Sequence, residues 1–112
     1  MKIKVGYADY TVKGMSPVLS DADSAEALCH PDTQTIYLRT DRSSQAQAAA
    51  LVHELIHACF DAFGLPKEDL CEEDVATKLE IPLINVIRDN PRLFSTLRAA
   101  LENGKALVKS KA

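Results

Sequence analysis

The chain has 112 residues, of which 46% are hydrophobic and 26% are charged, so it has the size and composition of one globular domain. These proportions exclude a disordered, collagen-like or low-complexity chain, and no apolar run is long enough for a membrane span. The formal net charge of −3 makes nucleic acid a poor partner, because phosphate binding needs a concentrated basic surface.

Residues 1–40 carry β-strand signals and no helical periodicity. Lys2–Val5 alternates basic and apolar residues, Tyr10–Val12 is rich in β-formers, and Thr35–Arg39 has the clearest strand pattern in the chain. If residues 26–29 are also extended, they pair with Thr35–Arg39 across a turn that contains Pro and Asp. We therefore expect a small antiparallel β-layer at the N-terminus.

A first helix follows, over about residues 44–63. Ser43 or Ser44 is suited to cap its start, and Gly64 is suited to end it. Apolar residues recur along it at steps of three and four, which predicts one buried face. The residues expected on that face are Val52, Leu55, Ile56, Cys59 and Phe63.

Two more helices are predicted, over about residues 71–89 and 91–103. Pro82 should kink the first of them, and Asn90 with Pro91 should cap and open the second, which ends at Gly104. Their expected inward residues are Val75, Leu79, Leu83, Val86 and Ile87 in the first, and Leu93, Phe94, Leu97 and Leu101 in the second. The prediction is a single α+β domain over residues 1–112, a small antiparallel β-layer followed by three helices.

The helix over residues 44–63 contains the motif HExxH, as His53, Glu54 and His57. Residues four apart on a helix differ by about 40° around its axis, so both imidazoles point the same way and can ligate one ion. Glu54 lies 100° further round than His53, where it can reach a water on the metal but is poorly placed to be a ligand. This spacing is typical of zinc peptidases that use the Glu as a general base.

A catalytic zinc site needs a third protein ligand and an open position for water. No His follows His57, and His30 lies in a turn-like segment of the β-layer, so carboxylates early in the second predicted helix are the better candidates. Helical geometry does not choose between Glu72, on the apolar stripe, and Glu73, beside it. Acidic residues are also common at a helix N-terminus for electrostatic reasons alone.

The segment HELIHACFDAFGL resembles the metal-binding helix of gluzincins, zinc peptidases with HExxH and a downstream Glu. The order of an IYL-type strand, HELxHA and EDVATKL is similar to the ImmA/IrrE-like minimal metallopeptidases. RDNPRL resembles small phage and prophage proteins of that group. The resemblance covers about residues 25–95, and it implies a zincin-like fold.

The resemblance also implies a ligand set of His53, His57 and Glu73 around Zn²⁺, with Glu54 as the catalytic base. In that family the ligand Glu is followed three residues later by a small residue and six later by a large apolar one. Counting from Glu73 gives Ala76 and Leu79 and fits better than counting from Glu72. Thr77 stands where the family often has Asn or Asp, so the contact that orients a ligand His is expected to be weaker or to come from elsewhere. Asp61 is one candidate.

The expected reaction is zinc-dependent hydrolysis of a peptide bond in an extended or unfolded segment of a protein partner. The resemblance implies that this partner is sometimes a transcriptional repressor. Tyr37 and His30 are candidates for the donor that stabilises the oxyanion, and the strand Thr35–Arg39 is a candidate to pair with the substrate. The oligomeric state is left open.

Three cysteines without CxxC spacing favour free thiols, and no secretory signal is recognisable, so we expect a cytoplasmic protein. An alternative function is a non-catalytic, metal-stabilised interaction module of phage type. Its third helix would then dock on a partner through Leu93, Phe94, Leu97 and Leu101.

Overall fold

The computed structural model describes residues 1–17, 27–66, 68 and 72–109, and for residues 72, 73, 76 and 80 the backbone alone. Along this part of the chain a four-stranded sheet comes first and three helices follow, which confirms the predicted α+β class. The elements are β1 (Lys2–Val5), β2 (Ala8–Met15), β3 (Ala27–His30), β4 (Thr35–Arg39), α2 (Ser44–Ala62), α3 (Glu72–Asp89) and α4 (Leu93–Glu102).

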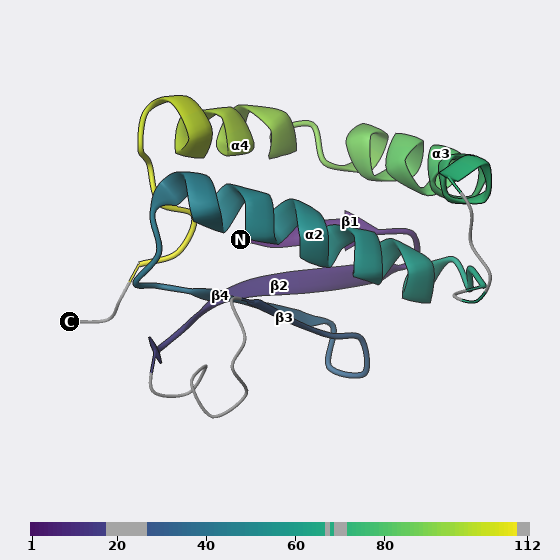
Figure 1. Ribbon diagram of the computed structural model, residues 1–112, viewed down its shortest axis with the longest axis horizontal. Helices are drawn as coiled ribbons and strands as arrows, with labels where there is room; N and C mark the ends of the chain where they lie inside the picture. The colour runs from purple at the N-terminus through teal and green to yellow at the C-terminus, as the bar shows by residue number, and fades with distance from the viewer. Residues whose placement is uncertain (18–26, 67, 69–71, 110–112) are drawn as a thin grey trace.

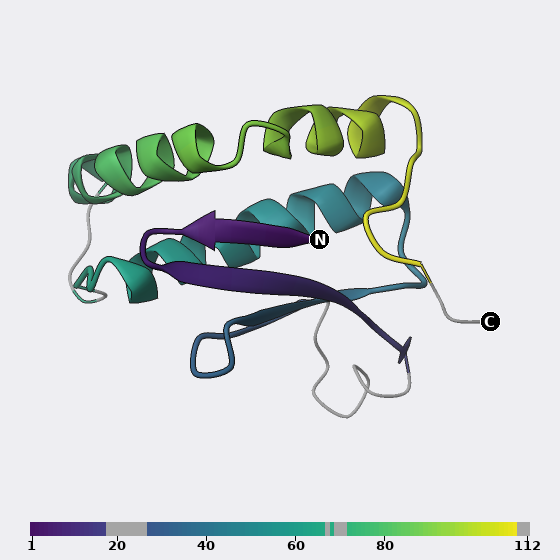
Figure 2. The ribbon, with the colours of Figure 1, turned by 180° about the vertical axis from the view of Figure 1, so that it is seen from behind.

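The helices all lie on one side of the sheet (Figure 1). α2 crosses the sheet face, and α3 and α4 run back along α2 in the opposite direction, one after the other (Figures 1 and 2). No helix of the described residues combines the length and the apolar character that crossing a membrane requires.

The sheet has the strand order β1-β2-β4-β3 and is mixed. β1 pairs with β2 and β3 pairs with β4 in antiparallel hairpins, and the second is the hairpin predicted from the sequence. β2 and β4 are parallel, with Thr11 opposite Thr35, so the prediction of a wholly antiparallel layer is wrong. Turn residues encode each hairpin locally, whereas the pairing between the two hairpins depends on contacts between distant segments.

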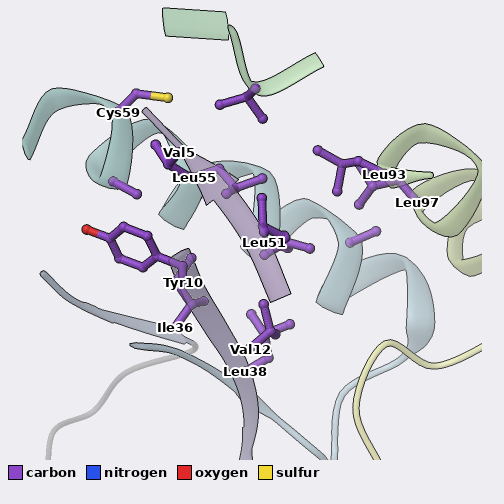
Figure 3. Close-up of a cluster of buried hydrophobic side chains, with 14 of the residues drawn as sticks. Val5, Tyr10, Val12, Ile36, Leu38, Leu51, Leu55, Cys59, Leu93 and Leu97 are labelled. Carbon is purple, nitrogen blue, oxygen red and sulfur yellow. The ribbon is translucent and has the colours of Figure 1, made fainter. Parts of the chain in front are cut away.

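The core lies between the sheet and the helices (Figure 3). Side chains alternate along the strands, so one face of β1, β2 and β4 is buried against the helices, and β3 contributes the partly buried Ala27 and Cys29. The largest side chains that the sheet contributes to the core are Ile3, Val5, Tyr10, Val12, Ile36 and Leu38. Among the described residues of β1, Lys2 and Lys4 take the opposite, exposed face, which follows the alternation expected for this strand.

α2 begins and ends as predicted. The Ser43 hydroxyl accepts a hydrogen bond from the amide of Ala46 at 3.1 Å, and the chain leaves the helix at Gly64, whose φ is +60°. Its buried face differs from the predicted one, because Val52 is exposed while Leu51 is fully buried. Leu55 and Cys59 are buried as expected. The helix is turned so that Leu51 rather than Val52 faces the sheet, and two polar residues, Gln47 and Glu54, share that buried face.

Gln47 is buried because its side-chain amide holds the C-terminal segment against the domain. Its Nε2 donates to the carbonyls of Arg39 and Val108 at 3.0 and 3.2 Å. Its Oε1 accepts from the amides of Leu107 and Val108 at 2.9 and 3.3 Å. One side chain thus joins α2, the end of β4 and the residues that follow α4.

α3 contains Pro82, as the sequence indicates, and its first turns run at an angle to its later turns in Figure 1. This change of direction is what a proline inside a helix causes, since it removes one backbone hydrogen bond. Leu79 and Val86 are buried and Val75 is partly buried, but Leu83 and Ile87 are exposed. The apolar stripe predicted for this helix is therefore wider than the face that is buried.

α4 begins at Leu93, two residues later than predicted. Leu93 and Leu97 are buried, and Phe94 and Leu101 are exposed, which corrects their predicted inward orientation. A helix that lies on top of α2 contacts it along a narrow line, so residues one step to either side of that line face solvent.

Asn90 does not cap α4, contrary to the prediction. Its side-chain amide pairs with the outer edge of β1: Nδ2 donates to the Lys4 carbonyl at 2.7 Å, and Oδ1 accepts from the Lys4 amide at 2.8 Å. Nδ2 also donates to the Val86 carbonyl at 2.9 Å. Asn90 therefore ties the end of α3 to the sheet.

Candidate metal centre

The predicted motif forms one cluster on α2. The ligating atoms of His53, Glu54 and His57 all lie within 4.8 Å of one another, so these three residues together could hold a metal ion. The rings of His53 and His57 have centroids 5.0 Å apart. Nε2 of His53 lies 3.8 Å from Oε2 of Glu54. This arrangement follows directly from the i, i+1 and i+4 spacing on a regular helix.

The three residues differ in burial, and this difference suits the histidines and the glutamate to different roles. The His53 side chain is 70% exposed and His57 is exposed as well, whereas Glu54 is only 7% exposed. Imidazoles at a surface can receive an ion and a substrate from solvent. A carboxylate that is almost fully buried next to them meets few competing waters. The cluster therefore has two outward ligands and one inward carboxylate.

The donor set suits zinc, which binds imidazole nitrogen and carboxylate oxygen. Ligands on one tetrahedral zinc are about 3.3 Å apart, because each bond is about 2.0–2.1 Å long. The observed spread of up to 4.8 Å is wider, but exposed histidine side chains have free rotamers with which to close it. His53 and His57 can therefore ligate one ion. Glu54 can either be a further ligand or lie beside the ion without ligating it.

The side chain of the predicted third ligand lies outside the described structure. Glu72 and Glu73 belong to the first turn of α3, and their side chains are not among those described. Glu73 therefore stays a prediction, with Glu72 as its alternative. Among the described residues, His53, Glu54 and His57 form the metal-competent cluster, and His30 is not part of it.

Two other sequence predictions fail on strand geometry. Ile36 and Leu38 of β4 face the helices, so Tyr37 between them faces the other side of the sheet. His30 contacts Tyr37 edge-on there, with ring centroids 5.6 Å apart. Neither side chain can donate to an oxyanion at a site on α2. The sequence TIYLR has apolar residues on both faces, so alternation alone did not reveal which one is covered.

The strand proposed to bind substrate is also the wrong one. β4 lies between β2 and β3, so both of its edges are already hydrogen-bonded. Among the described strands, β3 is at the sheet edge and packs against α2. Asp61, suggested as a residue that orients His57, is exposed and makes no hydrogen bond to His57 within the described structure.

A groove of about 510 Å³ opens beside the cluster, along the N-terminal half of α2. His53 and Glu54 border it at the motif, and Arg39 and Arg42 border it at the other end. The remaining lining residues are small or already bonded: Ala27, Ala46, Gln47, Ala49 and Ala50. Neither arginine was predicted from the sequence as a site residue. The signal available was their position at the end of the last strand (Arg39) and in the turn from it into the HExxH helix (Arg42).

Asp41 holds Arg39 in place at the end of the groove. Nε and Nη2 of Arg39 donate to the two carboxylate oxygens of Asp41 at 2.9 and 2.7 Å. These hydrogen bonds hold the pKa of Asp41 below its ordinary value, so Asp41 is ionised at neutral pH. Arg42 approaches the same carboxylate at 3.9 Å.

No protein-family model, no curated protein and no solved structure matches this chain.

Proposed function

We propose that this protein is a zinc-dependent peptidase, in which His53 and His57 bind the ion and Glu54 is the general base. The observation that carries the proposal is the His-Glu-His cluster on α2, with a buried Glu54 bordering a groove of about 510 Å³. The resemblance of HELIH to the gluzincin helix supports it, and a further ligand is expected from Glu73.

When bound, zinc would polarise the scissile carbonyl and lower the pKa of water at the site. Glu54 takes a proton from the attacking water with its carboxylate and gives that proton to the leaving amine. Its burial restricts its motion and keeps it next to His53. His53 and His57 act as neutral imidazoles, because only an unprotonated ring nitrogen binds a metal.

The groove suits an extended or unfolded segment of a protein, because it is open and has alanines along its helical wall. β3 lies at the sheet edge and contributes Ala27 to the groove, so it is the strand to which a substrate would add by backbone hydrogen bonds. By the resemblance, a transcriptional repressor is the first partner to test as a substrate.

The deciding variant is Glu54→Gln. It preserves the size of the side chain but cannot accept a proton at neutral pH, so it should fold, retain zinc and lose roughly two to four orders of magnitude in cleavage rate. Cleavage of unfolded proteins is measured by mass spectrometry, with a chelator-treated sample as the control. Cleavage by Glu54→Gln at the wild-type rate would refute the mechanism.

Zinc content tests the ligand set. His53→Ala and His57→Ala should each lose bound zinc, measured by elemental analysis of purified protein. Glu73→Ala should lower zinc content and Glu72→Ala should not, and the reverse result would move the third ligand to Glu72. Zinc that is unchanged in His57→Ala would exclude the site altogether.

A second candidate function is a non-catalytic interaction module in which Glu54 itself is a metal ligand. The observation favouring it is the set of large apolar residues exposed on α3 and α4: Ile81, Leu83, Ile84, Ile87, Phe94 and Leu101. Leu93 and Leu97, which were predicted to dock, are buried and unavailable. The same variant separates the two functions, because Glu54→Gln should lose zinc if Glu54 is a ligand and retain zinc if it is a base.

A further inference from the structure

The helices expose large apolar side chains that share one side of the helix layer. Six of these side chains are between 40% and 53% exposed, although residues of these types are usually buried. We call this set the apolar face. Its members are Val52 on α2, Leu83, Ile84 and Ile87 on α3, and Phe94 and Leu101 on α4.

The members on α3 lie on one flank of that helix. Each residue of an α-helix is turned by about 100° from the residue before it. Measured from the buried Val86, Leu83 is turned by about 60° and Ile87 by about 100°, both in the same sense. Ile84 is turned by about 160° in that sense and borders the flank, whereas Ile81, at about 220°, lies beyond it.

The members on α4 continue this flank. Measured from the buried Leu97, Leu101 and Phe94 are turned by about 40° and 60°, again in the same sense. α3 and α4 run one after the other in the same direction along α2, so the same sense of rotation means the same flank (Figures 1 and 2). Thr96 is turned by about 100° in the opposite sense, and it lines a pocket with residues 1–3 at β1. The flank therefore faces away from β1, on the side of α2.

Val52 extends the apolar face onto α2. Gln45 precedes Val52 by seven residues, which is close to two turns, so both side chains leave α2 on the same side. Nε2 of Gln45 donates to the Leu101 carbonyl at 3.4 Å, which shows that this side of α2 meets α4. Glu54, which lines the groove near β3, is turned from Leu51 in the sense opposite to Val52. The apolar face therefore crosses from α4 to α2 and is separate from the groove.

The apolar face has the area that one side of a dimer needs. A fully exposed large apolar side chain presents roughly 200 Å², so six that are about half exposed present roughly 600 Å². A standard protein interface buries about 800 Å² on each partner, of which about 450–520 Å² is apolar. The largest apolar patch of a typical monomer is about 300–600 Å², so the apolar face is at the upper end of that range.

The charges beside the apolar face favour a second copy of the same chain as its partner. Arg98 and Glu102 are exposed by 72% and 60% and lie next to Leu101 on α4, with Nη2 and Oε1 3.4 Å apart. They are four residues apart, which is about 6 Å along the helix. If two copies of α4 cross in antiparallel orientation about a two-fold axis between these residues, Arg98 of each copy lies opposite Glu102 of the other. A surface in a two-fold interface must be its own complement, and this pair meets that condition.

We propose that the apolar face is the interface of a homodimer, in which α4 crosses α4 of a second copy about a two-fold axis. The proposal names the partner of the exposed apolar residues on α3 and α4, and it holds whether or not the chain is a peptidase. Phe94 is the one aromatic residue of the apolar face. Because aromatic anchors are what make interfaces of this size tight, we expect a Kd of about 10–100 μM. At the concentration of about 1 μM at which denaturation is measured, the chain is then a monomer.

Analytical ultracentrifugation tests the interface through the dependence of mass on concentration. Wild type should pass from monomer to dimer between about 5 and 500 μM. Phe94→Glu and Ile84→Glu each place a charge inside the interface, so each should raise the Kd at least about a hundredfold. Tyr7→Glu is the matched control and should dimerise like wild type, since Tyr7 is a 74% exposed aromatic residue between β1 and β2. Far-UV circular dichroism checks that each variant keeps its fold.

An exchange of charges tests whether the partner is a second copy. Arg98→Glu alone and Glu102→Arg alone should each raise the Kd about tenfold, because each sets like charges opposite one another at two places. The double variant Arg98→Glu with Glu102→Arg restores opposite charges at both places, so its Kd should return to within about threefold of the wild-type value. A partner of another sequence would not carry the compensating change.

Three results would overturn the proposal. They are a wild type that is still a monomer at about 500 μM, dimers that persist in both Phe94→Glu and Ile84→Glu, and a Kd that does not respond to the exchange of charges. A monomer that instead sediments with vesicles of phosphatidylcholine and phosphatidylserine, and loses this binding in Phe94→Glu, would show that a lipid surface covers the apolar face and would also overturn the proposal. None of these results bears on the zinc and cleavage tests of the proposed peptidase.

Discussion

At the scale of single residues, the buried thiol of Cys59 makes stability depend on pH. Burial raises the pKa of Cys59 from its ordinary value of 9.0 to about 11, and burial also raises the pKa of the Tyr10 hydroxyl. Above about pH 9 the unfolded chain releases the Cys59 proton while the folded protein retains it. The stability is therefore fully present below pH 9 and is lost as the pH rises towards 11.

We expect the free energy of unfolding to fall by at most about 1.4 kcal/mol per pH unit from Cys59 across this interval. Urea denaturation at a series of pH values between 7 and 11 measures the slope. Cys59→Ala should reduce the slope, and Leu55→Ala, a core truncation without a titrating group, should lower stability at each pH with the slope unchanged. A wild-type slope in Cys59→Ala would contradict this account.

The same scale shows what residue spacing can predict. His53, Glu54 and His57 form a cluster because all three sit within four positions of one helix, so their geometry needs no knowledge of the rest of the fold. Tyr37 and His30 were placed wrongly because the facing of a strand depends on which side the helices cover. Arg39 and Arg42 were missed because a groove is formed by elements that meet only in the folded chain.

At the scale of elements, the exposed and buried leucines of α4 allow a direct test of its packing. Leu97 is 8% exposed and Leu101 is 48% exposed, although they lie one turn apart. Leu97→Ala should destabilise the protein by about 2–4 kcal/mol, because it leaves a cavity against the core. Leu101→Ala should cost less than about 1 kcal/mol.

Chemical denaturation of the two variants, which carry the same substitution in the same helix, measures this difference. Equal losses would mean that Leu101 is covered in solution, as an interaction surface would require.

The helix ends themselves were predictable, since Ser43 and Gly64 act through local capping. The buried face of α2 differs from the predicted one by one position, with Leu51 buried in place of Val52. The sequence has several neighbouring apolar residues there, so their spacing does not distinguish the two faces.

At the scale of the whole molecule, a bound ion should stabilise the fold, because the ligands are brought together only in the folded state. Zinc at about 100 times its Kd stabilises a protein by about 2.7 kcal/mol, which corresponds to a rise in Tm of about 10 °C for a domain of this size. Differential scanning calorimetry with added zinc or a chelator measures the shift.

Glu54→Gln should keep the zinc-dependent rise in Tm if Glu54 is a base, and His57→Ala should lose it. A rise in Tm that persists in His57→Ala would place the stabilising ion elsewhere.

The overall class was predictable because strands come before helices along the chain. The parallel pairing of β2 and β4 was not, because it joins two hairpins that the sequence specifies separately.

The contact between Asn90 and β1 has a consequence for how the protein behaves at high concentration. β1 lies at a sheet edge, and the Asn90 amide occupies the backbone N–H and C=O of Lys4 that would otherwise be available to a strand of a neighbouring molecule. Asn90→Ala uncovers these two groups, so concentrated solutions should form fibrils after a shorter lag time. Thioflavin T fluorescence measures the lag.

Asn85→Ala is the matched control, since Asn85 hydrogen-bonds only within α3. Equal lag times for the two variants would show that the lysines of β1 already prevent such association on their own. The difference in lag time between the two variants measures how much the Asn90 side chain delays fibril formation.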